Sequence, residues 1–504
     1  MNFKKWVLVS LAICFFYLFI LQLIAVWPFT IDDMYISLRY AKNWAKGYGL
    51  VWNIGEEPVE GYSNFSFVVL AASTIRLGFD PVIVLKAVNA FSLLLSTAAI
   101  YCLTRLWFPR WLALIPCLWL LTYRGELLWA VSGLETIFYQ ALISFSLFFL
   151  LRGIGYDVYP NQRAKPKILF LLSAGFLLGL AGLTRPEAPA LMILFAALAL
   201  LDSPKVERVE YYKKLSWGFF ICLLIFLPYF SWRWIYYGRL FPNPVYCKAF
   251  SNFFALADLR YLSLAFPLLI LSLPGIFKAE DKRHYYFWLP SFVYLAFLIN
   301  ADPVSAFENR LFLPVFALLL PLAFLGLARL LDYFLPKKDE IYYAGLIIGA
   351  FWFAFLFLQP LSLANYRSFT INPQVGIHLR GELLVWLEKN VPSKSSVFLA
   401  DSGQIPYHSS LRYIDSYCLN NKAMTSNLNI NMYQAMCDEV FIKKPEVLIL
   451  TSLLNCKGEE IFYAPADACV KNRLTHDKTY LFRKIFQTDC RDFAYRYEIY
   501  TLRN

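Results

Sequence analysis

Apolar runs of about 15 to 22 residues recur along the chain between Trp6 and Leu361. A helix needs about 20 apolar residues to cross the hydrocarbon core of a bilayer. Of the 504 residues, 59% are hydrophobic and only 16% are charged, whereas soluble domains carry about 25% charged residues. The chain is therefore expected to be a polytopic α-helical membrane protein, and the pattern argues against a soluble fold.

The hydropathy pattern predicts eleven transmembrane helices. The first is expected to remain uncleaved, because its apolar stretch is longer than that of a signal peptide and no A-x-A cleavage site follows it. The fifth and sixth runs are also open to interpretation as one broken hairpin. The predicted spans lie near 6–27, 82–103, 111–122, 136–151, 168–183, 188–201, 215–234, 259–277, 285–299, 311–331 and 341–361.

Basic residues predict the orientation of these spans, since cytoplasmic loops carry an excess of Lys and Arg. With the N-terminus inside, the predicted inner segments hold seventeen Lys and Arg residues, and the short outer loops after the second span hold five. Orientation thus explains the net charge of +12 better than nucleic-acid binding does. The C-terminus then lies outside, and the apolar run 65–77 is expected to be a juxtamembrane or re-entrant helix on the outer side.

The hydropathy falls near residue 361, which divides the chain into a transmembrane domain, 1–361, and a C-terminal domain, 362–504. The segment 379–392 has the pattern of an amphipathic helix, and 395–400 and 445–450 have the pattern of strands. An α/β or α+β domain is therefore expected on the outer side.

Five cysteines lie in the C-terminal domain, and an oxidising outer compartment would permit disulfides between them. An odd number leaves one cysteine over, and the pairing cannot be read from the spacing. No CxxC motif is present, so a zinc cluster has little support. The five are Cys418, Cys437, Cys456, Cys469 and Cys490.

Acidic residues are concentrated in the predicted outer segments, many of them close to a span end. Charge near lipid is costly, so such residues usually face a cavity. Each acid alone fits an ordinary solvated loop, but acids from five loops on one face favour a binding site. They are Asp32, Asp33, Glu56, Glu57, Glu60, Glu126, Glu135, Glu187, Asp302 and Glu308.

Two of these acids, Asp32 and Asp33, follow directly after the first predicted span. Thr30 and Asp33 match a capping box, ahead of a stretch with the pattern of an interfacial amphipathic helix. Capping accounts for Asp33 and leaves Asp32, which could act as a general base if partial burial raises its pKa. None of the four histidines falls on the predicted outer face of the transmembrane domain, so proton transfer there is assigned to carboxylates.

Basic residues near the outer span ends are candidates for binding phosphate, which Arg and Lys neutralise well. For the two lysines, headgroup contact or snorkelling is the alternative. For the two arginines, an ion pair with the nearby Glu187 or Glu308 competes. Together with the acids, these residues favour a phosphorylated lipid substrate, and no glycine loop for a nucleotide sugar or nucleotide cofactor is present. The four are Lys86, Arg185, Lys248 and Arg310.

The segment DDMYISLRYAKNWAKGYGLVWNIGEEPVEGYSNF, at 32–65, resembles the first outer loop of GT-C membrane glycosyltransferases. It looks closest to the mycobacterial-type terminal arabinofuranosyltransferases, which use decaprenyl-phosphate arabinose. The first motif is fairly specific, whereas the later ones are weak singly. The similarity continues in order over most of the chain, in AVSGLET (130–136), GLTRPEA (182–188), YYGRLFPNPVYCK (236–248), ENRLFLP (308–314) and FLADSGQIPYHSSLRYIDSYCLN (398–420).

The resemblance implies a GT-C fold in which Asp32 is the catalytic acid of the first outer loop, 28–81. Asp33 corresponds to the second acid of that motif, and Glu60 and Glu135 match positions that line the donor cavity in related enzymes. Some GT-C enzymes bind a divalent cation, so Asp32, Asp33 and Glu60 are candidate ligands for Mg²⁺, Mn²⁺ or Ca²⁺. The family pattern often carries Gly-Gly-Asp before NRLFLP, whereas this chain keeps only the acid of that pattern.

The expected function is inverting transfer of a sugar, such as a pentofuranose, from a polyprenyl-phosphate donor to a glycan or lipid acceptor. The site is expected to face the periplasm from a bacterial inner membrane, with Lys86, Arg185 and Lys248 near the donor phosphate and with Glu187 and Arg310 in the cavity. A polyprenyl-lipid flippase and a non-catalytic glycan-binding scaffold are the alternatives. Aromatic residues of the outer domain could bind the acceptor glycan or pack in the core, namely Tyr407, Tyr413 and Tyr417.

Overall fold

The structure is a computed structural model, and the residues that it describes fall into two compact units. The membrane unit consists of residues 1–28, 86–231 and 256–366, and the sheet unit consists of residues 29–85, 232–255 and 367–504. The beginning of the first predicted span and Asp302 lie outside the described residues. Those described are 13, 16–17, 19–160, 164–204, 207–249, 259–277, 282–299, 307–335, 340–358, 363–426, 432–490 and 493–503.

Within the described ranges, six helices are long and apolar enough to cross a membrane. α8 (Ile168–Thr184) and α9 (Ala188–Leu201) are apolar but shorter, and the predicted count of eleven spans stays a prediction. The six are α4 (Pro81–Thr104), α7 (Thr136–Gly153), α10 (Arg208–Tyr237), α12 (Arg260–Phe277), the segment 308–334 and α15 (Glu340–Phe357). The segment 308–334 joins the 3-10 turn η1 (Phe307–Phe312) to α14 (Leu313–Phe334).

Two predicted spans contain helices that are short for a bilayer. The run 285–299 contains α13 (Tyr285–Phe297), and the run 111–122 contains α5 (Leu114–Thr122). At 1.5 Å per residue, α5 is about 14 Å long, which is less than half of the bilayer core of about 30 Å. The chain breaks at Tyr123 before the short helix α6 (Arg124–Ala130) begins, so α5 alone does not cross a membrane.

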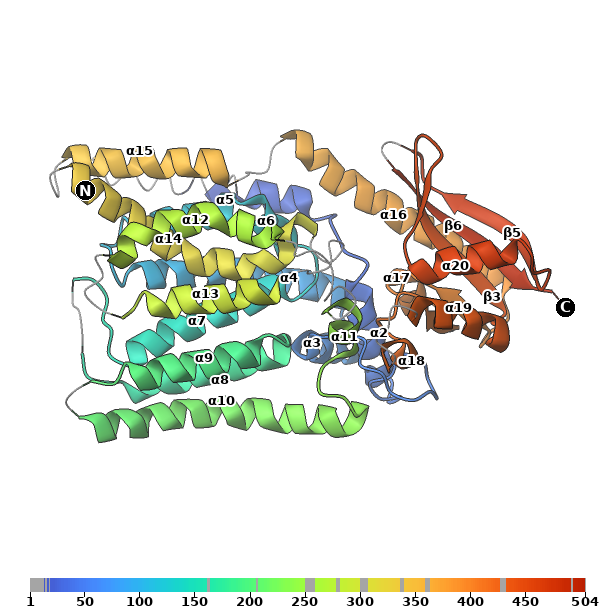
Figure 1. The fold of residues 1–504 in the computed structure, drawn as a ribbon, viewed down its shortest axis with the longest axis horizontal. Coiled ribbons are helices and arrows are strands. Elements are labelled where there is room, and N and C mark those ends of the chain that lie inside the picture. Colours follow the sequence, from blue (N-terminus) through green and yellow to red (C-terminus); the bar gives the residue numbers. More distant parts are fainter. Residues whose placement is uncertain are drawn as a thin grey trace. The chain divides into compact units, whose positions relative to one another are not determined.

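Helix α14 forms the centre of the membrane unit and packs against α7, α12, α13 and α15 (Figure 1). Its side chains are buried without interruption from Leu313 to Ala328, which explains why this helix is apolar on every side. A Cβ added at Gly326 would lie 1.7 Å from the carbonyl oxygen of Leu271. The glycine therefore lets α12 and α14 approach backbone to backbone, as small residues do in membrane helix pairs.

Helix α3 (Phe65–Arg76) belongs to the sheet unit. Its 12 residues give a length of about 18 Å, which is too short to cross the bilayer core. This length agrees with the expectation that the run 65–77 is not a full span. Whether it is juxtamembrane or re-entrant stays a prediction.

Helix α2 (Met34–Ala45) differs from the surface helix that the sequence pattern predicted. Polar as well as apolar residues of α2 are buried, including Arg39. The Arg39 guanidinium donates to the carbonyls of Trp52, at 2.8 Å, and Leu411, at 3.2 Å, so later segments of the chain cover its polar side. The predicted cap is also wrong, because the Asp33 side chain makes no capping hydrogen bond.

The C-terminal part of the sheet unit is built on one mixed sheet with the strand order β2-β1-β3-β6-β5, while β4 pairs with β3. The strand β1 is parallel to β2 and β3, and β6 is antiparallel to β3 and β5. Strands β1 and β3 correspond to the runs predicted at 395–400 and 445–450. The strands are β1 (Ser396–Leu399), β2 (Arg412–Asp415), β3 (Val447–Asn455), β4 (Glu460–Phe462), β5 (Tyr480–Gln487) and β6 (Phe493–Leu502).

Helices precede and connect these strands (Figure 1). The predicted helix at 379–392 corresponds to the end of a longer helix, α16, and a short loop connects α16 to β1. The boundary predicted between domains at 361 and 362 stays a prediction. The helices are α16 (Leu363–Asn390), α17 (Gln404–His408), α18 (Lys422–Ser426), α19 (Met432–Lys443) and α20 (Pro465–Leu474).

Three disulfides stabilise the sheet unit. Two of them, Cys437–Cys469 and Cys456–Cys490, lie within the C-terminal domain. The fifth cysteine of that domain, Cys418, pairs with Cys247 on α11 (Asn243–Ala249). The partner of the odd cysteine thus comes from the loop before the predicted eighth span, which counting cysteines within the C-terminal domain could not show.

Candidate active site

Asp32 lies in the sheet unit, in the segment just before α2, and its carboxylate is held by three later parts of the chain. Arg380 on α16 directs its Nε to Asp32 Oδ1 at 3.2 Å and to Asp401 Oδ2 at 3.0 Å. The backbone N–H of Gln404 donates to Asp32 Oδ1 at 2.9 Å. The Asp32 side chain is 15% exposed, so this predicted catalytic residue is mostly buried and still open to solvent.

Asp401 stands just after β1 and is the more deeply buried of the two carboxylates, with a side chain 6% exposed. The hydroxyl of Tyr495 donates to Asp401 Oδ2 at 3.2 Å, and the hydroxyl of Tyr497 donates to the same oxygen. Both tyrosines lie on β6, so the sheet fixes this end of the cluster. We call Asp32, Arg380 and Asp401 the carboxylate pair site.

Gly403 is required for the close approach of Asp32 to this loop. A Cβ at position 403 would lie 2.0 Å from Asp32 Oδ2 and 2.3 Å from the Asp32 carbonyl oxygen. Any side chain there would displace the carboxylate. The glycine of the FLADSGQ segment is therefore explained by steric exclusion of any side chain, which the sequence alone did not reveal.

The environment shifts the proton affinity of the two carboxylates in opposite directions. Burial raises the pKa of Asp32 well above its ordinary value, and Asp401 adds to this rise while Arg380 opposes it. Burial also acts to raise the pKa of Asp401, but Arg380 and the Tyr497 hydroxyl outweigh it and leave that pKa lowered. A raised pKa is what a general base near neutral pH requires.

Glu60 is engaged by an arginine that the sequence analysis did not single out. Arg233 Nη2 lies 2.7 Å from Glu60 Oε2, and Arg233 Nε lies 2.9 Å from the same oxygen and 3.1 Å from Oε1. The two side chains are only 4% and 2% exposed. Glu60 is thus buried in an ion pair, and its predicted contact with substrate stays a prediction.

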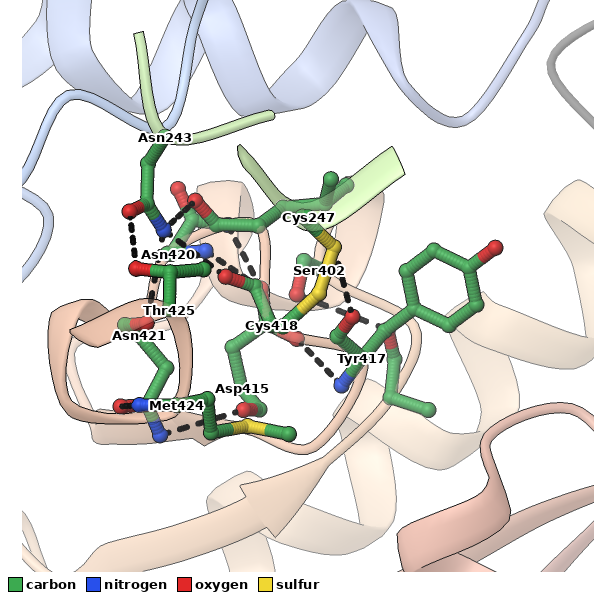
Figure 2. Close-up of a disulfide and its surroundings, with 12 residues drawn as sticks. Asn243, Cys247, Ser402, Asp415, Tyr417, Cys418, Asn420, Asn421, Met424 and Thr425 are labelled. Carbon is green, nitrogen blue, oxygen red and sulfur yellow. Dashed lines mark hydrogen bonds between the residues drawn. A yellow bond between two sulfur atoms is a disulfide. The ribbon is translucent and has the colours of Figure 1, made fainter. Parts of the chain in front are cut away.

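Lys248 lies on α11, directly after the disulfide-bonded Cys247, and is half-buried. The same helix is fixed from its other end by Asn243, whose amide donates at 2.9 Å to the carbonyls of both Cys418 and Leu419 (Figure 2). The helix that presents Lys248 is therefore held in place by a covalent bond and by a buried amide.

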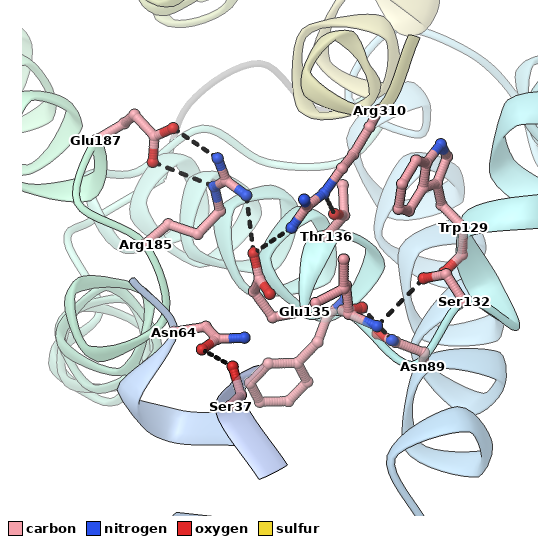
Figure 3. A network of polar contacts seen from close by, with 12 residues as sticks. Ser37, Asn64, Asn89, Trp129, Ser132, Glu135, Thr136, Arg185, Glu187 and Arg310 are labelled. Carbon is pink, nitrogen blue, oxygen red and sulfur yellow. Dashed lines mark hydrogen bonds and ion pairs between the residues drawn. The ribbon is translucent and has the colours of Figure 1, made fainter. Parts of the chain in front are cut away.

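The membrane unit holds a second polar cluster, built around Glu135 at the start of α7 (Figure 3). Glu135 Oε1 receives Arg185 Nη1 at 2.8 Å and Arg310 Nη2 at 2.9 Å. Arg185 also binds Glu187 through Nη2 at 2.7 Å and Nε at 3.1 Å, and Arg310 Nε donates to the hydroxyl of Thr136 at 2.9 Å. The structure thus brings together four predicted site residues from three separate segments.

This ion-pair cluster decides between the alternatives that the sequence left open for the arginines. Arg185 does pair with Glu187, but Arg310 pairs with Glu135 and not with Glu308. Glu308 instead binds Arg124, at 2.7 Å. The two arginines and the two glutamates of the cluster balance in charge, so a free positive charge for phosphate is not evident at Arg185.

Lys86 lies near the start of α4, where its ammonium group donates to the carbonyl of Trp27 and lies 5.0 Å from the Trp27 ring. One turn later on the same helix, Asn89 donates to the carbonyl of Leu134 and accepts from the N–H of Phe138 at 3.3 Å (Figure 3). The α4 face that carries Lys86 therefore packs against the beginning of α7.

The carboxylates proposed as metal ligands do not form a metal site. Among the described residues, no three His, Cys, Asp or Glu side chains gather into a group that could hold an ion. Asp32 is engaged by Arg380 and Glu60 by Arg233, and arginine competes with a cation for carboxylate oxygens. The divalent cation implied by the resemblance thus does not fit Asp32, Asp33 and Glu60 as they are arranged here.

The aromatic residues proposed for glycan binding separate into two groups. Tyr413 is 2% exposed, so core packing, the alternative that the sequence analysis gave for it, explains this residue. The ring of Tyr407 packs tilted against that of Tyr35, with ring centroids 5.5 Å apart. The ring of Tyr417 packs in the same way against that of Tyr463, also at 5.5 Å. Both are half-buried, and their role stays a prediction.

Sequence reasoning missed Arg380, Asp401 and Arg233. A local signal existed for Asp401, which follows the predicted strand 395–400 directly, where ligand-binding residues of parallel strands commonly stand. Arg380 was inside the predicted amphipathic helix, where a basic residue is ordinary. No short-range pattern links these residues with Asp32, since the chain brings them together only in three dimensions.

Comparison with known proteins addresses the fold. The search of curated proteins found no match. The C-terminal residues 367–500 match a family described as a domain of unknown function, DUF8728. Among solved structures, ArnT from Cupriavidus metallidurans bound to undecaprenyl phosphate superposes with a TM-score of 0.58 at 12% identity, over 99% of this chain and 98% of that one.

Two further structures extend this likeness. The oligosaccharyltransferase AglB from Archaeoglobus fulgidus, solved with an inhibitory peptide and a dolichol-phosphate, has a TM-score of 0.55 at 12% identity, over 92% of this chain and 74% of that one. The arabinofuranosyltransferase AftD from Mycobacteria has a TM-score of 0.51 at 13% identity, over 100% of this chain but 40% of that one. All three are GT-C proteins.

The chain adopts the GT-C fold. It is a multi-pass helical membrane protein, as the apolar runs predicted. At 12 to 13% identity, the likeness concerns the fold alone. Within this GT-C chain, the DUF8728 segment contains both Arg380 and Asp401. The region of unknown function therefore supplies two of the three residues of the carboxylate pair site.

Proposed function

We propose that this GT-C chain is an inverting glycosyltransferase, which moves a sugar from a polyprenyl-phosphate donor to a glycan or lipid acceptor. The observation that carries the proposal is the Asp32 carboxylate, which follows the first apolar segment, is mostly buried and is held by Arg380. Two proteins of similar fold were solved with undecaprenyl phosphate and dolichol-phosphate, and this supports a polyprenyl-phosphate donor.

In the proposed step, Asp32 accepts the proton of an acceptor hydroxyl while the acceptor oxygen forms a bond to the anomeric carbon. The bond between that carbon and the phosphate oxygen breaks, and polyprenyl phosphate leaves with the electron pair. One displacement inverts the anomeric centre. The chain needs a positioned base and positive charge for the leaving phosphate, and no step requires a nucleotide or a metal.

For the phosphate, we propose Lys86 and Lys248 ahead of Arg185. Arg185 already neutralises Glu135 and Glu187, so its charge is committed. We assign to Arg185, Arg310, Glu135 and Glu187 the task of holding the beginnings of α7 and α9 in register. A change of KM for the donor in Lys86→Gln or Lys248→Gln would support these two contacts, and an unchanged KM would remove them.

The three disulfides of the sheet unit support the proposed sidedness, since disulfides persist in oxidising compartments such as the periplasm. We therefore place Asp32 and the C-terminal domain on the periplasmic side of a bacterial inner membrane, with the N-terminus in the cytoplasm. Accessibility of a single introduced cysteine at the exposed Asp489, labelled with an impermeant maleimide in intact spheroplasts, tests this placement. Labelling only after permeabilisation would contradict it.

The function is tested with purified full-length protein in lipid nanodiscs and radiolabelled polyprenyl-phosphate sugars, both pentofuranoses and hexopyranoses. Asp32→Asn is expected to abolish transfer, while Asp438→Asn, at a surface ion pair with a side chain 46% exposed, serves as the matched control. Normal turnover in Asp32→Asn would remove Asp32 as the base. Wild-type protein that moves labelled lipid between leaflets of vesicles without any transfer would replace this function with that of a flippase.

A further inference from the structure

Asp401 has no role in the mechanism above, although it shares the arginine Arg380 with the proposed base as an ion-pair partner. Arg380 Nε contacts Asp32 Oδ1 and Asp401 Oδ2 at nearly equal distances, 3.2 and 3.0 Å. The Arg380 guanidinium, which donates to Asp401 and forms an ion pair with Asp32, holds the two carboxylates side by side. The three residues come from the segment before α2, from α16 and from the loop after β1, so the contact exists only in the folded chain.

Charge at this position does not balance when both carboxylates are ionised. The side chains of Asp32, Arg380 and Asp401 are 15%, 15% and 6% exposed, and two negative charges would then face one positive charge. Two carboxyl groups that share a poorly solvated site usually retain one proton between them. One retained proton makes the carboxylate pair site neutral.

We propose that Asp401 is a positioning residue for sugar transfer, which shares one proton with Asp32. Because Arg380 and two tyrosine hydroxyls hold the charged form of Asp401, that proton stays on Asp32, and the neighbouring charge makes Asp32 the stronger acceptor for the proton of the acceptor hydroxyl. This inference rests on the proposed function. Before each transfer Asp32 releases its proton to solvent, since it is the more exposed of the two carboxyls, and during transfer it takes up the proton of the acceptor hydroxyl. The DUF8728 segment thereby completes the active site instead of only covering it.

The donors around Asp401 support this assignment. Tyr495 and Tyr497 both direct hydroxyl groups at Asp401 Oδ2, and Arg380 lies 5.5 Å from the Tyr495 ring. These contacts stabilise the charged form of Asp401 and hold its carboxylate in one orientation. Two further titratable groups interact electrostatically with the pair. Tyr35 on α2 interacts with Asp32, and Tyr463, just after β4, interacts with Asp401.

The first test is the pH dependence of kcat/KM for transfer by full-length protein in nanodiscs. In Asp401→Asn, Asp32 keeps Arg380 and loses the neighbouring carboxylate, so the acid limb of the profile is expected to move to lower pH by at least about one unit. In Tyr497→Phe, the charged form of Asp401 loses a donor, so Asp401 takes up the shared proton more readily and the acid limb is expected to move to lower pH by a smaller amount. Tyr500→Phe, on the same strand and bound to Glu498, is the matched control and leaves the limb unchanged.

A shift of the acid limb to lower pH in both variants cannot arise from a general loss of structure, which would lower the rate at every pH. An acid limb at the same pH in wild type, Asp401→Asn and Tyr497→Phe would overturn the proposal. If Asp401→Asn does not fold, Tyr497→Phe alone decides, because a profile that superposes on that of wild type removes Asp401 from the proton equilibrium.

A second measurement does not depend on turnover. Infrared spectra of the protein at neutral pH should contain a C=O stretch of one protonated carboxyl that is lost in Asp32→Asn and also in Asp401→Asn, because the proton belongs to the pair. A band that persists in both variants overturns the shared proton. If the band behaves as expected but wild-type protein transfers no sugar from any donor, the proton-sharing pair stands and the proposed function fails.

Discussion

Arg233 and Glu60 form a buried ion pair between the end of α10 and the loop after α2, closed by three hydrogen bonds of 2.7 to 3.1 Å. A buried pair of this kind holds its two segments in one register, because neither charge can be left alone in a poorly solvated interior. The pair shows that the loop after α2 is buried at Glu60, although other residues of that loop, such as Glu56 and Glu57, are exposed.

Removal of one partner of this pair is expected to destabilise the sheet unit strongly. Arg233→Gln leaves Glu60 buried without its cation, at a cost of about 3 kcal/mol, which thermal unfolding in detergent would measure. The double variant Glu60→Gln with Arg233→Gln should lose clearly less than the sum of the two single variants. Additive losses would mean that the two side chains do not interact.

The disulfide between Cys247 and Cys418 is expected to contribute about 2 to 5 kcal/mol to the stability of the sheet unit. It joins residues that are 171 positions apart, so its loss frees a long loop. Cys418→Ser should lower the unfolding temperature and leave Cys247 reactive toward a thiol reagent. Cys102→Ser, at a free cysteine of α4, is the control, and equal melting of both variants would contradict the pairing.

Substitution of Gly403 tests the geometry of the carboxylate pair site. Gly403→Ala places a methyl group where Asp32 Oδ2 now lies, and a displacement of about 1 Å at a catalytic group lowers kcat about a hundredfold. Gly381→Ala, beside Arg380 on α16 with open space around its Cβ position, should retain activity. Transfer at the wild-type rate by Gly403→Ala would show that Asp32 is not the reacting group.

The ion-pair cluster of the membrane unit is expected to be structural. Glu135→Gln removes the negative charge that Arg185 and Arg310 share, so a loss of about 3 kcal/mol is expected in unfolding experiments. Lys165→Gln, at a surface pair whose lysine is 82% exposed, should leave the stability of the protein nearly unchanged. A stable Glu135→Gln protein with a raised KM for the donor would instead assign the cluster to substrate binding.

Stability of the sheet unit should depend on pH through Asp467 on α20. Burial raises the pKa of Asp467 to about 7, although hydrogen bonds from the Ser416 hydroxyl and the Thr451 N–H act to lower it. An acid whose pKa is higher in the folded state adds stability below its unfolded pKa, and this stability is lost as pH rises through about 7. The free energy of unfolding should therefore fall between pH 4 and 8 by on the order of 4 kcal/mol, and Asp467→Asn should remove this pH dependence. A pH profile unaltered in that variant would contradict the shift.

The apolar runs predicted a polytopic membrane protein, and the GT-C resemblance anticipated the fold that the structural comparisons support. Adjacent motifs such as SGLET and LTRPEA also predicted several residues that the structure gathers around Glu135. Local pattern was sufficient for the membrane character because each apolar run can be matched to the thickness of the bilayer independently of the other runs.

The amphipathic pattern of α2 misled, because a helix with a polar face can be covered by polar partners from elsewhere in the chain. Arg39 on that face binds the carbonyls of Trp52 and Leu411, so its charge is compatible with burial. The sequence shows that a side chain is polar, but it does not show which distant acceptor will meet it.

By itself the sequence determined the membrane character of the chain and the mixed helix and strand content near its end. It also pointed to Asp32 as a candidate general base. Only the tertiary structure decided that Asp32 is joined by Arg380 and Asp401, that Glu60 is bound by Arg233 and that Cys247 completes the disulfides. Hydrophobicity and helix or strand period are local properties, whereas a buried charge is stable only with a partner, and the folded chain alone brings that partner within hydrogen-bond distance.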